Sequence, residues 1–343
     1  MQEVKVTPVV FTGKASEYFG VWIVNLLLSI ITLGVYSAWA KVRRKKYFYQ
    51  HTFIDGVAFD YHASPIAILK GRMLALALFI LYSLSGQIAP VLSVVFPLLL
   101  TIFLPWIIVR SLTFNARNSS YRGLRFDFNG SLKDAWRYYI LLPLLLVFTL
   151  GLLYPFIAHG RNRFIMQGHR FGLSQVQSDF SLGSFYKVYL QALAILILVG
   201  LTVVGLGSVL LTVAGMHIDF NNPSFIWPLI LGYTLSITMA AAFLRSRVLN
   251  LVWKGSRIDQ ISFDSNLSAR GLIWLYVTNL LALIFSLGLL APWAHVRTAR
   301  YHAERLALVG ATDFEQFVGE KKAEVKAAGE EIGEMFDIDV AFG

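Results

Sequence analysis

Basic side chains interleaved with aromatic ones follow three apolar stretches of this chain. The densest cluster runs over residues 41–46, and single arginines stand at related positions further on. Next to a bilayer, each basic residue gains about 1 kcal/mol from an anionic surface. The same residues could simply anchor the orientation of the chain in a membrane, and both interpretations stay open. The candidate lipid- or anion-binding residues are Lys41, Arg43, Arg44, Lys46, Arg161, Arg163, Arg297 and Arg300.

Other chemistry finds little support in the residue pattern. His295 and His302 lie seven residues apart, close to two helical turns, but arginines rather than carboxylates surround them. The segment 13–16 (Gly-Lys-Ala-Ser) lacks the upstream glycine of a phosphate-binding loop. We therefore predict no catalytic residues, no metal and no cofactor, although a membrane-embedded enzyme stays open as a third class of function.

Composition places the chain in a membrane. Of its 343 residues, 56% are hydrophobic and 15% are charged, and mean hydropathy is +0.61. Soluble domains carry about 25% charged residues. The net charge of +10 fits the excess of Lys and Arg in cytoplasmic loops, and no nucleic-acid motif accompanies it. Membrane phospholipids are thus the expected partners and nucleic acid is not; protein partners and oligomeric state are not predicted.

Three segments share a pattern at fixed spacing. A leucine precedes each of Gly34, Gly151 and Gly288, and an aromatic residue stands twelve positions before and five positions after each glycine. A basic residue and an aromatic one follow at twelve and thirteen positions beyond it. Agreement at so many offsets predicts an internal triplication.

Seven apolar stretches approach the length of about 20 residues that crosses a bilayer. If all seven crossed, eleven of the 30 lysines and arginines would lie on the outer side. If only the four stretches without the glycine pattern crossed, the outer loops would contain no lysine or arginine, and this distribution favours that arrangement. The stretches are 21–40, 73–89, 91–109, 138–158, 188–213, 225–244 and 272–294.

The three patterned stretches are therefore predicted to be re-entrant or interfacial helical hairpins that turn at Gly34, Gly151 and Gly288. Glycine permits such a turn, and the limb of about 13 residues before each glycine is too short to span. Kinked spanning helices are the alternative, since membrane helices tolerate Gly and Pro. The hairpin arrangement makes the protein a multi-pass membrane chain with both termini in the cytoplasm.

Short strand-like segments flank each hairpin, before it at 4–12, 124–129 and 258–264 and after it at 57–61, 173–180 and 312–317. Strands on one cytoplasmic side could pair into small sheets. The fold class is thus an α-helical membrane protein with three repeats, four spanning helices and three hairpins. Its divisions are repeats at 1–65, 111–184 and 248–318, helix pairs at 66–110 and 185–247, and a cytoplasmic tail at 319–343.

Few polar groups lie at membrane depth. The interiors of the four spans contain no Asp, Glu, Lys, Arg or His, which argues against a transporter coupled through an acid relay. Asn25 and Asn279 stand nine residues before their glycines, and Gln191 lies in the third span. Such residues either line a polar path or fasten helices together by hydrogen bonds.

The three Leu-Gly hairpins, the segment 38–41 (Ala-Trp-Ala-Lys) with its basic run, and the closing 336–339 (Phe-Asp-Ile-Asp) resemble the YjgN family of bacterial inner-membrane proteins. The resemblance implies a multi-pass protein of the cytoplasmic membrane. It implies no activity and no functional residues.

Two classes of function remain. The first is transport or the handling of lipids and other anionic amphiphiles at the inner leaflet, with the cationic limbs as the binding residues. The alternative is a non-catalytic scaffold or assembly factor that recruits partners through its cytoplasmic sheets and tail.

Overall fold

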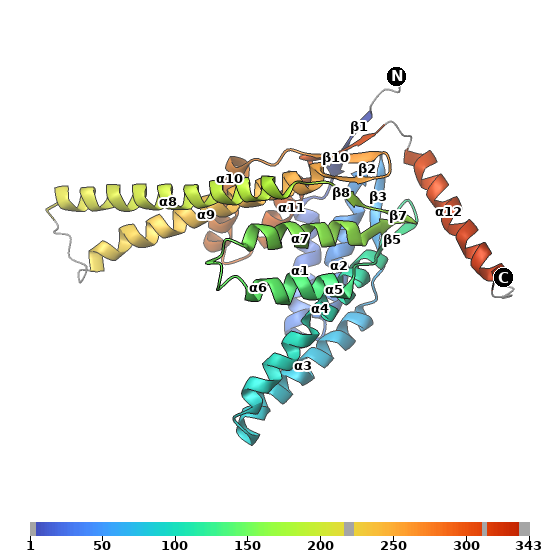
Figure 1. Cartoon of the computed structure of the whole chain (residues 1–343), viewed down its shortest axis with the longest axis horizontal. Coiled ribbons are helices and arrows are strands. Elements are labelled where there is room, and N and C mark those ends of the chain that lie inside the picture. Colours follow the sequence, from blue (N-terminus) through green and yellow to red (C-terminus); the bar gives the residue numbers. More distant parts are fainter. Residues whose placement is uncertain (1–4, 216–222, 311–313, 336–343) are drawn as a thin grey trace.

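The computed structural model describes residues 5–215, 223–310 and 314–335, and within them helices project from one antiparallel sheet (Figure 1). The helices are α1 (Ala15–Ile31), α2 (Ser37–Gln50), α3 (Pro65–Ile88), α4 (Leu92–Arg117), α5 (Leu132–Trp136), the π-helix η1 (Arg137–Leu141), α6 (Leu142–Leu144), α7 (Tyr154–Gly168), α8 (Leu182–Val213), α9 (Pro223–Lys254), α10 (Ala269–Phe285), α11 (Ala291–Ala303) and α12 (Phe314–Met335).

The strands form a single sheet that nearly closes into a barrel. Its order is β7-β6-β5-β4-β3-β2-β1-β11-β10-β9-β8, and only Val176 separates β7 from β8, the two ends of that order. The strands are β1 (Lys5–Phe11), β2 (Thr52–Ile54), β3 (Val57–Tyr61), β4 (Ser119–Tyr121), β5 (Leu124–Phe128), β6 (His169–Phe171), β7 (Ser174–Gln175), β8 (Gln177–Ser178), β9 (Ser256–Ile258), β10 (Ile261–Ser265) and β11 (Leu306–Gly310).

Every pair of long helical limbs leaves one strand and returns to its neighbour in the sheet. The α1–α2 pair connects β1 to β2, and these strands are hydrogen-bonded to each other. The same holds for α3–α4 between β3 and β4, for α5–α7 between β5 and β6, for α8–α9 between β8 and β9, and for α10–α11 between β10 and β11. Because paired strands lie on one side of any membrane, each helical pair must also begin and end on that side.

Tight turns join the strands at the other rim of the barrel. Asp55-Gly56 and Arg122-Gly123 both have positive φ, the backbone that a two-residue hairpin turn of the mirror-image type requires. Asp259 also has positive φ and turns β9 into β10. The barrel therefore has one rim of turns and one rim from which the helices leave.

Two of the longer pairs could cross a membrane. The spans long and apolar enough are Pro65–Ile88, Leu92–Arg117, Leu182–Val213 and Leu229–Lys254, and each overlaps one of the four predicted spans. Both pairs project away from the strands in Figure 1. The described chain is thus that of a membrane protein with four helices of spanning length.

Each of the three patterned stretches is interrupted at the expected glycine by a turn between two helical limbs. Gly34, Gly151 and Gly288 have φ of +90°, +81° and +87°, and the leucine before each also has positive φ. The longest limb, α1 or α10, has 17 residues, fewer than a span needs. The described structure contains turns at these positions, not continuous kinked helices.

The predicted small sheets are wrong, because all flanking strands join one near-barrel. The expected strand at 258–264 is instead a hairpin, β9–β10, and the one at 173–180 divides into β7 and β8. The expected strand at 312–317 is also wrong: the third hairpin returns through β11, the chain is helical from Phe314, and residues 311–313 lie outside the described parts. Short strands that pair only across long separations leave weak local signals.

Candidate functional site: a cationic pocket at the first hairpin

A pocket of about 430 Å³ lies between α1, α2 and α3, and we call it the cationic pocket. Its lining carries three cations, Lys41 and Arg44 from α2 and Arg72 from α3, and none of its lining residues is acidic. The complete lining is Tyr18, Trp22, Asn25, Leu26, Ser29, Ser37, Ala40, Lys41, Arg44 and Arg72.

The turn at Gly34 brings these residues together. It reverses the chain so that α2 packs antiparallel to α1, which faces Asn25 and Ser29 toward Lys41 and Arg44. Thr32 closes the turn, since its hydroxyl donates to the carbonyl of Leu28 at 2.6 Å and accepts from the amide of Tyr36 at 2.9 Å. Arg72 then reaches in from α3, and its guanidinium donates to the Ser37 hydroxyl.

Asn25 is the most unusual polar group in this pocket. Its side chain is buried, and its carbonyl oxygen Oδ1 has no hydrogen-bond partner within the described residues. A buried carbonyl without a partner costs about 1–3 kcal/mol. The residue lines the pocket, although this oxygen is itself buried.

The corresponding asparagine of the third hairpin makes the contrast clear. Asn279 Oδ1 accepts from Arg297 Nη1 at 3.2 Å, and Asn279 Nδ2 donates to the Thr298 hydroxyl at 3.1 Å. Arg297 also donates to Thr278 and lies over the Trp293 ring. Asn279 therefore fastens helices α10 and α11 together, whereas Asn25 Oδ1 has no such partner in the part of the chain that the structure describes.

Electrostatics at the first hairpin favour an anion. Lys45 stands beside the pocket, with its ammonium 4.7 Å from the centre of the Tyr61 ring. Burial first, and then repulsion from Lys41 and Arg44, lower the pKa of Lys45. Burial also raises the pKa of Tyr18 to about 12, so this phenol stays neutral at the floor of the pocket.

The eight predicted cationic candidates do not form one site. Lys41 and Arg44 line the pocket, and Lys46 and Arg43 are exposed on the same helix, where Arg43 donates to the Tyr36 hydroxyl at 2.9 Å. Arg163 is exposed on α7. The remaining three make contacts that hold the fold: Arg161 with the Tyr138 carbonyl, Arg297 with Asn279, and Arg300 with the Gly13 carbonyl.

Sequence reasoning missed Arg72. It stands one residue before the predicted apolar stretch 73–89, where its charge marks only the cytoplasmic end of a span. Its role in the pocket depends on the packing of α3 against α2, which no local pattern encodes.

Gln191, the third polar residue predicted at membrane depth, lies in a separate groove of about 640 Å³ between α8 and α9. Lys187 and Arg247 line the same groove, together with Ser184 and the aromatic ring of Phe243. Two cations at the strand-side end of this helix pair repeat the chemistry of the first hairpin. The two asparagines and Gln191 lie in different places and do not line one continuous path.

The histidines of α11 give a pH prediction. Burial and the neighbouring Arg44 lower the pKa of His295, and burial and Arg245 lower the pKa of His302. The folded protein thus binds fewer protons than the unfolded chain, so stability rises with pH up to the unfolded pKa of about 6.5 and falls below it. We expect the midpoint temperature of thermal unfolding to decrease when the pH is lowered from 7.5 to 5.5. The decrease should be smaller in a variant that carries both His295→Gln and His302→Gln. An equal fall in both proteins would contradict this assignment.

Comparison with known proteins identifies relatives of the chain. Residues 6–335 match the family model described as "Bacterial protein of unknown function (DUF898)". The inner membrane protein YjgN of Salmonella typhimurium is 25% identical over 360 aligned positions, which cover 91% of each chain. The inner membrane protein YjgN of Escherichia coli K12 is 34% identical over 149 positions, which cover 41% of this chain and 36% of that protein. No solved structure matches.

Proposed function

This chain belongs to the DUF898 family of bacterial proteins and is similar to inner membrane proteins named YjgN. We propose that it binds anionic phospholipid headgroups at the cytoplasmic leaflet of the inner membrane. The cationic pocket is the proposed site. The observation that carries the proposal is a single pocket lined by Lys41, Arg44 and Arg72 together with Asn25, whose buried carbonyl oxygen has no partner among the described residues.

The chemistry of the pocket selects among headgroups. Three cations favour a phosphate that no ammonium group of the same lipid neutralises. The Asn25 carbonyl accepts a hydrogen bond, which a glycerol hydroxyl can donate. Phosphatidylglycerol combines both groups, whereas phosphatidylcholine has a quaternary ammonium and no hydroxyl donor.

The exposed surface of the three hairpins supports their immersion in the leaflet next to the barrel. Leu33, Leu150 and Leu287 at the tips are 95%, 91% and 94% exposed. A soluble protein rarely exposes such contiguous apolar surface, and a bilayer would cover it. Re-entrant hairpins would hold the cationic pocket at headgroup depth, with the barrel and both termini in the cytoplasm.

The proposal can be tested first with the unsubstituted protein. The delipidated protein in mild detergent is incubated with phosphatidylglycerol or phosphatidylcholine, and bound lipid is counted by native mass spectrometry. We expect at least a tenfold preference for phosphatidylglycerol that weakens as salt is raised, because exposed charges are screened. Equal retention of the two lipids would contradict the proposal.

A scaffold role is the second candidate, favoured by the exposed surface of α12. Residues 322–326 of this helix are exposed and mostly charged. A stoichiometric partner that co-purifies with the full chain, and is lost when residues 322–343 are removed, would support this candidate. Lipid preference unchanged by that removal would show that the two roles are separate.

A further inference from the structure

The interior of the barrel contains an apolar cavity of about 500 Å³, which we call the lumen. Aromatic and aliphatic side chains from β1 to β11 line it, among them Phe59, Phe126, Phe171, Ile261 and Leu308. Two polar groups at its wall have internal partners: the Tyr121 hydroxyl donates to the Ile54 carbonyl at 2.8 Å, and His169 Nδ1 lies 2.7 Å from the Ile165 carbonyl. Arg170 also lines the lumen, and its buried Nε has no hydrogen-bond partner among the described residues.

Strand number explains why space remains. Side chains just fill a barrel of about eight strands, and wider barrels enclose a cavity. This sheet has eleven strands, two of them very short. Its inward residues are already large, so the remaining volume follows from the diameter of the barrel and not from small side chains.

The first two turns of α12 close the rim of turns. Phe317 and Val318 are 8% and 2% exposed and line the lumen, and the Phe317 ring stacks on Phe171 at 6.2 Å. Lys321 holds the helix there, with its ammonium 2.9 Å from Asp259 Oδ2, which also accepts from the Ser174 hydroxyl at 2.6 Å. Beyond Lys321, the described side chains of α12 are exposed.

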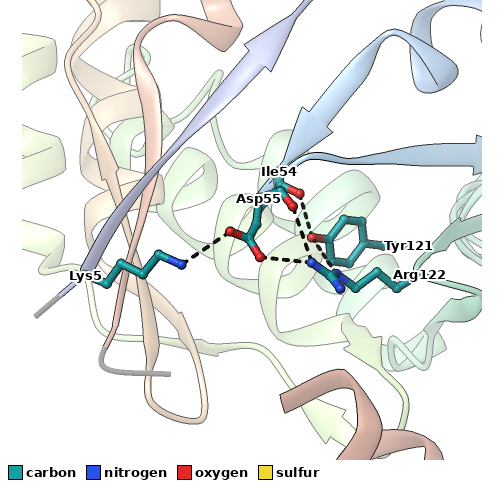
Figure 2. Close-up of polar contacts among 5 residues, drawn as sticks. All are labelled: Lys5, Ile54, Asp55, Tyr121 and Arg122. Atoms are coloured by element: carbon teal, nitrogen blue, oxygen red, sulfur yellow. Dashed lines mark hydrogen bonds and ion pairs between the residues drawn. The ribbon is translucent and has the colours of Figure 1, made fainter. Parts of the chain in front are cut away.

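A polar network stiffens the same rim. Asp55 pairs with Arg122 at 2.9 Å and with Lys5 at 3.3 Å, and Arg122 Nε also donates to the Tyr121 hydroxyl at 3.3 Å (Figure 2). The network ties the β2–β3 turn to the β4–β5 turn and to the start of β1. The rim is therefore a fixed frame on which α12 rests through few contacts.

We propose that the lumen binds a single hydrocarbon chain of an amphiphile and that the first two turns of α12 are its lid. An apolar cavity of about 150 Å³ holds one benzene. By proportion, 500 Å³ holds one chain of roughly 16 to 20 carbons and not two. A fatty acid therefore fits, whereas a two-chain phospholipid does not. This site is separate from the cationic pocket and does not depend on the proposed function.

Neighbouring residues of β1 give a matched pair of variants. Val9 points into the lumen and is 6% exposed, whereas Val10 points outward and is 47% exposed. The membrane-embedded protein is photolabelled with palmitic acid that carries a diazirine at the chain end, and adducts are mapped to peptides. We expect Val9→Trp to lower labelling of β5 and β10 about tenfold and Val10→Trp to leave it unchanged. Equal labelling of β5 and β10 in the two variants would overturn the assignment of the lumen. The same conclusion would follow if a diazirine-bearing phosphatidylglycerol labelled these strands as strongly as the palmitic acid probe does.

The lid is tested by comparing two redox states of one protein. This comparison is independent of Val9→Trp and remains valid if that variant does not fold. The native chain has no cysteine, and a Cβ at Gly172 would lie 3.5 Å from Lys321 Cβ, within disulfide range. A Gly172→Cys, Lys321→Cys variant should bind the palmitic acid probe when reduced and lose at least nine-tenths of that labelling when oxidised. Equal labelling in the reduced and oxidised states would overturn the role of α12 as a lid. If the probe labels the lumen neither in the reduced variant nor in the unsubstituted chain, the binding site itself is overturned.

Discussion

Replacing Lys41, Arg44 and Arg72 together with glutamine is expected to weaken binding to phosphatidylglycerol vesicles about 100-fold. Each pocket cation can donate a charge-assisted hydrogen bond to one bound phosphate, and at about 1 kcal/mol each the three contribute about 3 kcal/mol, where 1.4 kcal/mol is a factor of ten. All three line one pocket, so their loss should act on one binding event. The measurement is a titration of the purified protein with vesicles of defined composition.

A matched variant separates the pocket from net charge. Lys46, Lys133 and Arg163 are exposed and do not line the cationic pocket. Their replacement with glutamine removes the same charge and should lower the affinity only a few-fold. If the two triple variants lose affinity equally, the pocket has no special role and the basic residues act as a diffuse surface.

Gly160→Ala is expected to destabilise the protein by about 1–3 kcal/mol, the usual cost of overpacking. A Cβ at this position would lie 2.0 Å from Tyr138 Cε1, closer than any real contact. Arg161 Nε donates to the Tyr138 carbonyl at 2.9 Å, so the backbone that carries this ring is held beside α7. The expected result is a clear fall in the thermal midpoint of the purified protein.

Gly20→Ala is the control for this substitution. Gly20 lies within α1, and a Cβ there would meet nothing within 4 Å. Alanine in a helix is favoured over glycine by roughly 0.5–1 kcal/mol, so this variant should be neutral or slightly more stable. A Gly160→Ala protein as stable as Gly20→Ala would show that α7 does not pack tightly on η1.

The helical part of this fold could be predicted because its signals are local. Length and hydropathy define a span, and the positions of Lys and Arg separate spans from broken stretches. The turns at Gly34, Gly151 and Gly288 follow from spacing alone, and each has the positive φ that glycine accommodates. Within the second hairpin, the π-helix η1 was not predicted; Pro143, two residues after it, has no amide to donate to the turn before it.

The barrel could not be predicted from the same patterns. Strands such as β4 and β7 have three and two residues, too few for an alternation to be recognised. Their pairing joins residues far apart in sequence, as between β1 and β11. The lumen and its lid exist only through this closure, so no motif marked Phe317 or Lys321 as functional candidates.

The candidate site was predicted in part. Lys41 and Arg44 were identified by their density, and Asn25 by its position nine residues before a glycine. Charge density could not distinguish Lys41 and Arg44 from the other basic candidates. In the folded protein, Arg161, Arg297 and Arg300 donate hydrogen bonds that join different elements. That distinction depends on side-chain partners, and it requires the packed structure.

The placement of the barrel and the pocket on the cytoplasmic side is tested most directly by single cysteines in this cysteine-free chain. Leu173 lies at the rim of turns, Val91 lies between α3 and α4, and Leu150 lies at a hairpin tip; all three are exposed. A membrane-impermeant maleimide added outside spheroplasts should label Val91→Cys and leave Leu173→Cys and Leu150→Cys unlabelled. After the membrane is opened, Leu173→Cys should also be labelled, whereas Leu150→Cys should stay unlabelled. Labelling of Leu173→Cys from outside would contradict the account.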